Sequence, residues 1–142
     1  MTGILELPEE DAKKSARKLE EALENYAAGK YNNAVANCLT ALRLYRTNAT
    51  EIYFVMGLAH LELGTLATEW DINDTIVACE NFSVVISRAP ECAAAYYYRG
   101  KAILRWGNNY RRALADFEKV LELEPENVEA REYCEICRQQ LE

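Results

Sequence analysis

The sequence predicts an all-α protein built from repeated pairs of helices. Three observations support this fold class. Half of the 142 residues are hydrophobic, and only 3 Pro and 6 Gly interrupt them, a composition that suits a helical chain and not a disordered one. Apolar residues recur at helical spacing over most of the chain, as they do on one face of a helix. Two segments also repeat one pattern of aromatic, small and proline residues, which is typical of a repeat protein.

The first pair of helices is predicted over residues 15–48. Its first helix is expected to start near Pro8, because proline and the acidic residues after it suit the first turn of a helix. An apolar stripe follows, and Gly29 ends it. The second helix of the pair is expected over residues 31–45. Since this pair lies at one end of the array, its departures from the repeat pattern are expected.

The second pair is predicted over residues 50–92. Thr50 is a suitable N-cap for its first helix, which is expected to stop at Gly64. The stretch from Gly64 to Ala78 is longer than the matching stretches of the other two pairs. We therefore predict an insertion over residues 66–74, which forms a loop at one edge of the array.

The third pair is predicted over residues 93–126, with a turn at Gly107. After it, Asn127 is expected to cap a last helix over residues 127–141. The outer side of that helix is polar, as in the capping helix of a repeat array. Residues 1–142 are thus predicted to form a single domain of about seven antiparallel helices.

The second and third pairs share an aromatic residue, a glycine, an alanine, a phenylalanine and a proline at matching positions. These residues are Tyr53, Gly57, Ala78, Phe82 and Pro90 in one pair and Tyr96, Gly100, Ala113, Phe117 and Pro125 in the other. The pattern resembles that of the tetratricopeptide repeat (TPR) family. The resemblance implies a TPR-type right-handed α-solenoid with three repeats and a C-terminal capping helix. The small residues would let helices approach closely, and the phenylalanines would fill the space between them.

The resemblance also implies a concave groove, formed by the first helix of each repeat, that binds a peptide or an amphipathic helix of a partner protein. Projected onto this sequence, the groove comprises Leu19, Leu23, Tyr26, Glu51, Phe54, Val55, Leu58, Tyr97, Tyr98, Lys101 and Arg105. Such residues share a side because they recur at three- or four-residue spacing along each helix. The predicted groove is largely apolar, with positive charge at its third-repeat end. Packing between helices is the alternative role for its leucines and for Phe54.

One TPR subclass, the carboxylate-clamp type, grips the acidic C-terminal tail of its partner with Lys, Asn and Arg side chains. The corresponding residues here are Leu19, Leu23, Val55, Ala94 and Tyr98. None of these side chains offers the charge-assisted hydrogen bonds that such a clamp uses. We therefore predict that the domain is not of the carboxylate-clamp subclass, and that its partner segment is apolar or amphipathic.

The predicted insertion contains two large apolar residues, Trp70 and Ile72. Two roles are open for them. They either pack onto the solenoid or form a tip that contacts a partner.

Composition and charge exclude several kinds of partner. A formal net charge of −7 provides no basic surface for phosphates, which argues against nucleic acid. No apolar run has the length of a membrane span, so membrane insertion is not expected. Five cysteines form no disulfide framework, which favours a reducing, intracellular location such as the cytoplasm.

No set of residues with catalytic or metal-binding spacing is present. Cys134 and Cys137 form a single C-x-x-C pair on an apolar helical stripe, where small structural side chains are the better interpretation. His60 is the only histidine and has no partner nucleophile. We therefore predict no enzyme, no cofactor and no bound metal.

The function predicted from the sequence is that of a protein–protein interaction module, an adaptor, scaffold or co-chaperone-like domain. The alternative is a self-associating structural subunit of a larger assembly. In that case a homodimer would form by insertion of Ile4, Leu5 and Leu7, or of Trp70, into a second copy.

Overall fold

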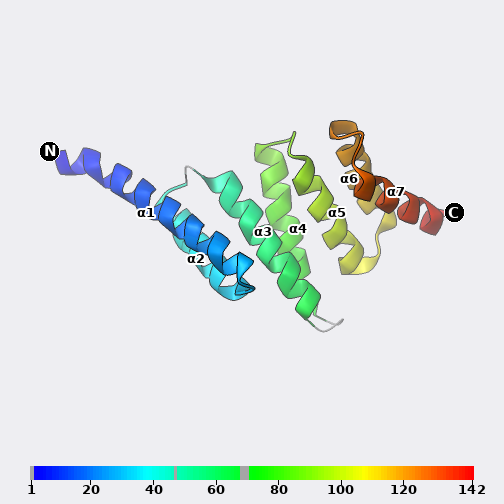
Figure 1. Cartoon of the computed structure of the whole chain (residues 1–142), viewed down its shortest axis with the longest axis horizontal. Coiled ribbons are helices and arrows are strands. Elements are labelled where there is room, and N and C mark those ends of the chain that lie inside the picture. Colours follow the sequence, from blue (N-terminus) through cyan, green and yellow to red (C-terminus); the bar gives the residue numbers. More distant parts are fainter. Residues whose placement is uncertain (1, 47, 68–70) are drawn as a thin grey trace.

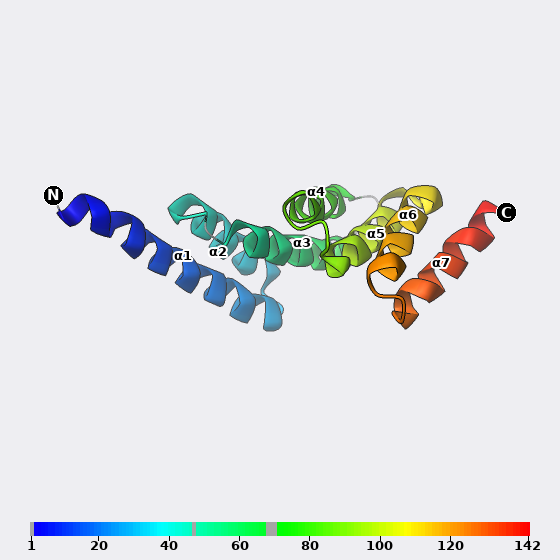
Figure 2. The same cartoon turned by 90° about the horizontal axis from the view of Figure 1, so that it is seen from above.

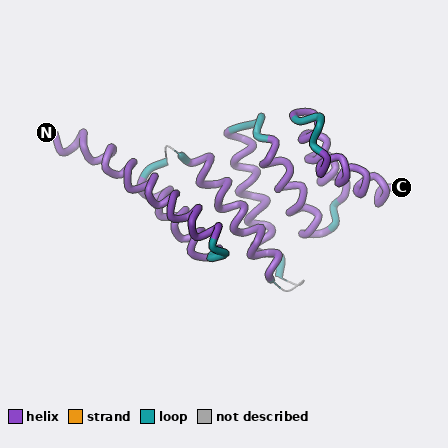
Figure 3. Tube along the Cα trace, viewed as in Figure 1, coloured by secondary structure: helices purple, strands orange, loops and turns teal. Residues whose placement is uncertain are grey.

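The computed structural model describes residues 2–46, 48–67 and 71–142, with side chains from residue 9 onward. This part of the chain contains seven α-helices and no strand (Figures 1 and 3). The helices are α1 (Thr2–Ala27), α2 (Tyr31–Leu44), α3 (Ala49–Leu66), α4 (Asn73–Arg88), α5 (Ala93–Gly107), α6 (Tyr110–Leu123) and α7 (Val128–Leu141). The predicted all-α fold is therefore confirmed.

The helices stack along one direction. Each helix packs chiefly against the helices before and after it in the chain, and the two termini lie at opposite ends of the molecule (Figures 1 and 2). Helices α1 and α3 are also in contact, as are α3 and α5. The first helices of successive pairs therefore lie side by side and share one face of the stack.

In each of the two recognisable repeats, a phenylalanine of the second helix faces a glycine of the first helix. Phe82 and Phe117 are fully buried. A Cβ atom at Gly57 would lie 2.7 Å from Cε1 of Phe82, and one at Gly100 would lie 2.8 Å from Cζ of Phe117. Distances this short leave no room for a methyl group, so glycine is what lets each first helix approach the ring of its partner helix.

A buried ion pair joins α5 to α6. The Arg99 guanidinium donates from Nη2 to Oδ1 of Asp116 over 2.7 Å and from Nε to Oδ2 over 2.9 Å. The Asp116 side chain is only 6% exposed. Arg99 also donates from Nη1 to the hydroxyl of Ser83 on α4 over 3.2 Å. The hydrogen bond to Asp116 raises the pKa of Arg99, and the charged pair links three successive helices.

The start of α1 differs from the prediction. The helix begins at Thr2 and continues through Pro8. A proline removes one backbone N–H donor, but in the early turns of a helix this does not force the helix to begin there. The first turns of α1 project past the end of α2 (Figure 1).

The predicted N-cap of α3 is also wrong. Thr50 lies inside the first turn, because α3 begins at Ala49, after Asn48. The Thr50 hydroxyl accepts a hydrogen bond from Nε of Arg88 over 3.0 Å. This contact with α4 uses the oxygen that the sequence assigned to capping.

The predicted cap of the last helix is confirmed, and it leads to a stability prediction. Oδ1 of Asn127 accepts from the backbone N–H of Ala130 over 2.9 Å. Replacing Asn127 with Ala should lower the free energy of unfolding by about 1 kcal/mol, because an N–H of the first turn loses its partner. Urea denaturation followed by circular dichroism measures this. Asn127→Ser is the control, since serine keeps an acceptor there. Equal loss in both variants would contradict a capping role.

Candidate functional site

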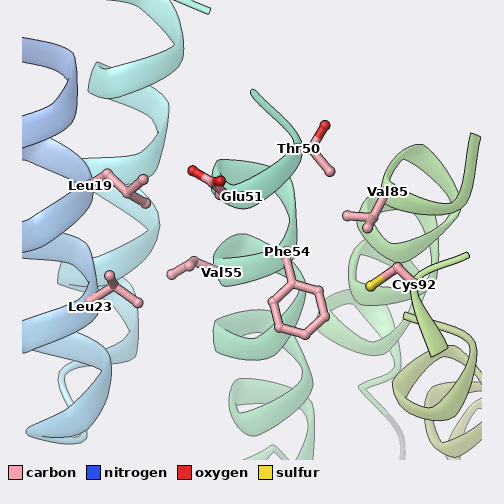
Figure 4. Close-up of a pocket in the computed structure, with 8 residues that line it drawn as sticks. All are labelled: Leu19, Leu23, Thr50, Glu51, Phe54, Val55, Val85 and Cys92. Carbon is pink, nitrogen blue, oxygen red and sulfur yellow. The ribbon is translucent and has the colours of Figure 1, made fainter. Parts of the chain in front are cut away.

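An open cavity of about 390 Å³ lies on the face that α1 shares with α3. Figure 4 shows Leu19 and Leu23 on α1 facing Val55 on α3, with Phe54 beside them. The lining residues are Leu19, Leu23, Thr50, Glu51, Phe54, Val55, Val85 and Cys92. The structure thus brings together five of the residues that the sequence assigned to a groove.

The floor of this cavity is part of the core, whereas its rim is open to solvent. Leu19 and Val55 belong to the cluster of buried side chains that joins the first two helix pairs. Leu23, one turn further along α1, is 49% exposed. An exposed leucine next to an apolar floor provides surface that a second apolar side chain can cover.

An aromatic row continues the same face from α3 to α5. The Phe54 ring packs edge-on against Tyr98, with 6.0 Å between ring centroids. Tyr98 in turn packs edge-on against Tyr97 at 5.2 Å, and Tyr97 meets Tyr133 of α7 at 6.0 Å. Leu58 packs against the core cluster beneath this row. Tyr97 and Tyr98 are therefore half-buried side chains that support the face as well as line it.

Tyr26 extends the face on the α1 side. Its ring lies 5.5 Å from that of Tyr31. The pKa of the Tyr26 hydroxyl is raised by burial first, and then by the Glu62 carboxylate, by Tyr98 and by Tyr31. Glu62 lies on α3, Tyr98 on α5 and Tyr31 on α2, so Tyr26 of α1 is near residues of the other two first helices as well as of its own partner helix.

A second cavity, of about 330 Å³, lies where α5 meets the turn between α6 and α7. It is lined by Ala93, Ala94, Tyr97, Tyr98, Glu124, Asn127 and Glu129. The pKa of Tyr97 is raised by burial first and then by neighbours that include Tyr133 and Glu129. This cavity combines two aromatic rings with acidic side chains.

The two basic residues assigned to the groove have different surroundings. The Lys101 ammonium lies over the tyrosine rings, 5.5 Å from the centroid of Tyr97 and 5.8 Å from that of Tyr98. Arg105 instead donates from Nε to the carbonyl of Gly64 over 2.8 Å, and from Nη2 to that of Thr65 over 3.3 Å. These carbonyls lie in the last turn of α3, where backbone C=O groups have no N–H partner within the helix. Arg105 therefore stabilises the contact between α3 and α5.

The predicted insertion over residues 66–74 overlaps the connection between α3 and α4 but is longer than it, because Leu66 is the last residue of α3 and Asn73 and Asp74 are the first two of α4. Trp70 lies outside the described residues. Ile72 is half-buried and immediately precedes α4. Beyond it, Oδ1 of Asp74 lies 2.8 Å from Nδ1 of His60, so this histidine joins α3 to α4.

Sequence reasoning missed several residues of the two cavities. Val85 comes from the second helix of its pair, and Glu124 and Glu129 come from the turn before the last helix and from its start. The predicted groove consists of residues from first helices alone, so these residues lie outside it. The acidic residues around Pro125 were visible in the sequence, but their position next to Tyr97 depends on how α7 packs.

Four of the five thiols, those of Cys38, Cys79, Cys134 and Cys137, are protected by burial. Burial raises the pKa of Cys38 to about 12 and that of Cys79 to about 11. The pKa values of Cys134 and Cys137 are raised by burial as well. Because the thiolate is the reactive form and the metal ligand, these surroundings do not favour redox or metal chemistry.

The described residues provide neither a metal site nor a membrane-spanning helix. No group of three or more His, Cys, Asp or Glu side chains among them is arranged to hold a metal ion. Within the same residues, no helix has both the length and the apolar character needed to cross a membrane.

Comparison with solved structures identifies similar folds. The "First TPR of Spaghetti (RPAP3) bound to HSP90 peptide SRMEEVD" matches with a TM-score of 0.78 and 22% identity, over 92% of this chain and 94% of that one. The "Arabidopsis OM64 TPR domain" matches with a TM-score of 0.77 and 24% identity, over 92% and 98%.

The second TPR domain of human RPAP3, solved with the HSP70 peptide SGPTIEEVD, matches with a TM-score of 0.74 and 21% identity, over 92% of this chain and 98% of that one. No family model matches the sequence, and no curated protein matches it. At these identities the likeness shows a shared fold.

Proposed function

From the tetratricopeptide repeat fold that this chain has, we propose that it is a protein-interaction module, not an enzyme. It acts as an adaptor, scaffold or co-chaperone-like domain in a reducing compartment such as the cytoplasm. Its shared face of α1, α3 and α5 binds an apolar or amphipathic segment of a partner protein. The single observation that carries this proposal is the open cavity around Leu23, which leaves an apolar floor uncovered.

The similar structures support a peptide as the kind of ligand, since two of them hold peptides of HSP90 and HSP70. Both peptides end in the acidic sequence EEVD. The cavity between α1 and α3 has no basic lining residue, and Glu51 lies at its rim. A carboxylate placed here would lose its water without gaining a charged partner. We therefore propose that the partner inserts an apolar side chain.

The burial of the lining residues suits this role. Leu19 and Val55 are held in place by the core, so they form a preformed surface that loses little conformational entropy on binding. Leu23 and Phe54 stand above it and cover the flanks of an inserted side chain. An apolar anchor in such a pocket, surrounded by a polar rim, is the usual form of a binding hot spot.

Replacing Leu23 with Ala tests the proposal. The probes are peptides selected from a random dodecapeptide phage library on the wild-type domain, with synthetic SRMEEVD as the acidic comparison. We expect the selected peptides to bind Leu23→Ala about 5- to 30-fold more weakly, because about 1–2 kcal/mol of apolar contact is lost. Fluorescence anisotropy measures the affinities. SRMEEVD is expected to bind the wild type more weakly than the selected peptides do.

Leu39→Ala is the matched control, because Leu39 is an exposed leucine on α2 that does not line the cavity. Its peptide affinities should equal those of the wild type. Equal losses in the two variants would refute an anchor site at Leu23. Tighter binding of SRMEEVD than of any selected peptide would show that the domain is an acidic-tail binder after all.

A second candidate function, self-association, is favoured by the projecting start of α1 (Figure 1). Its sequence includes Ile4, Leu5 and Leu7. Sedimentation velocity at two protein concentrations separates the two functions. The proposed binding module sediments as a monomer at both. A dimer that disappears on deletion of residues 2–7 would instead support a structural subunit.

A further inference from the structure

We propose that the second cavity, between α5 and the start of α7, binds a basic side chain of the partner segment, an arginine or a lysine. This inference rests on the proposed function, which it extends by defining the charge of the ligand. The partner segment would then carry an apolar residue for the cavity at Leu23 and a cationic residue for the cavity at Glu129.

The lining of the second cavity is complementary to a cation. Tyr97 and Tyr98 contribute aromatic rings, and Glu124 and Glu129 contribute carboxylates. Asn127 is already engaged: its Oδ1 accepts from Ala130, and its Nδ2 donates to Oε2 of Glu124 over 3.1 Å. None of the ion pairs between described residues involves Glu129. Its carboxylate is therefore available to a ligand.

The same tyrosine rings already attract a cation in the free domain. The Lys101 ammonium lies within 6 Å of both ring centroids, which is the range of a cation–π interaction. A guanidinium or ammonium from the partner would use the same rings from the cavity side, next to Glu129. Lys101 would repel such a group, so it should weaken the binding of a basic side chain.

The charge along the face agrees with a basic partner. Glu51 lines the first cavity, and the Glu62 carboxylate acts on Tyr26, which extends the same face on the α1 side. The chain as a whole carries a formal net charge of −7. Such a field attracts a cationic segment and repels an acidic one.

The two cavities adjoin at the start of α5, so one ligand can occupy both. Cys92 lines the first, and the next two residues, Ala93 and Ala94, line the second. The edge-on contact between Phe54 and Tyr98 joins their walls. A single extended or helical segment that passes the start of α5 therefore reaches both.

A double-mutant cycle tests the inference. The tightest selected dodecapeptide is synthesised with its basic residue and with norleucine in its place, and both are titrated against the wild type and Glu129→Gln. On the wild type, norleucine should weaken binding about 5-fold, the upper range for a partly exposed ion pair. On Glu129→Gln this difference should become clearly smaller, although Tyr97, Tyr98 and Glu124 still line the cavity. Glu126→Gln, in the same turn but outside the cavity lining, should keep the full difference.

A third variant, Lys101→Gln, gives the sign of the local field. This variant should bind the basic peptide more tightly than the wild type does, and its affinity for the norleucine peptide should be unchanged. Selected peptides without enrichment of Arg or Lys would overturn the inference, as would an equal norleucine effect on the wild type and Glu129→Gln. If the selected peptides still bind Leu23→Ala more weakly than the wild type in either case, the proposed function stands and only the cationic site is refuted. A selection that yields no binding peptide would reject both.

Discussion

Replacing Phe117 with Ala should lower the free energy of unfolding by about 3–5 kcal/mol. The ring is fully buried, stacks on Tyr133 with 4.7 Å between centroids, and fills the space beside Gly100. Its removal leaves a cavity at the meeting point of α5, α6 and α7, and helices in a stack relax only partly into such a space. Urea denaturation measures the loss. Trp106→Ala is the control, because that ring is 38% exposed and its removal should cost far less.

The same contact can be tested with Gly100→Ala in two backgrounds. In the wild type the new methyl group would lie 2.8 Å from Cζ of Phe117, so the variant should be destabilised although alanine is the better helix former by about 1 kcal/mol. In the Phe117→Ala background the space is free, and Gly100→Ala should stabilise the domain. The same sign in both backgrounds would show that the ring does not limit this position.

Replacing Asp116 with Ala should be the second most costly change, at about 3 kcal/mol, because it leaves the Arg99 guanidinium without its partner in a largely buried place. The Asp116 side chain is 6% exposed and that of Arg99 is 24% exposed. The double variant Arg99→Leu/Asp116→Leu should cost less than Asp116→Ala alone, because no unpaired charge remains. Thermal unfolding of the variants measures the order. A double variant that loses the sum of both single changes would contradict this account.

The fold was predictable from the sequence because its signals are local. Gly57, Phe82, Gly100 and Phe117 stand at fixed spacings, and each pair meets within one repeat. The other helices were predicted from apolar residues that recur at helical spacing. The start of α1 was not predictable in this way. A proline fits the first turn of a helix and also fits a slightly later one, and the residues before it decide between them.

The candidate site was predictable only where a first helix supplies the side chain. Leu19, Leu23, Phe54 and Val55 follow from helical spacing and line one cavity. Arg105 shares that spacing, yet its guanidinium binds the last carbonyls of α3. Spacing gives the side of a helix on which a residue stands, but the length of a side chain and the end of a neighbouring helix decide what it contacts.

The three successive tyrosines illustrate the same limit. Because successive residues point about 100° apart around a helix, Tyr96, Tyr97 and Tyr98 cannot all face one core, and the sequence assigned Tyr97 and Tyr98 to the groove. In the structure Tyr97 also meets Phe117 at 6.1 Å and Tyr133 at 6.0 Å. The position of α7 decides this, and no pattern within α5 contains that information.

The stacking of each helix mainly on its chain neighbours has a consequence for cooperativity. Helix α1 packs on α2 and α3, so the end of the array can open without breaking contacts at α6 or α7, and local opening is governed by nearest-neighbour interfaces. A segment bound across α1, α3 and α5 would contact all three helices directly, without the intervening helices α2 and α4. The occupied domain would then exchange amide hydrogens as one unit, where the free domain exchanges them from its ends inward.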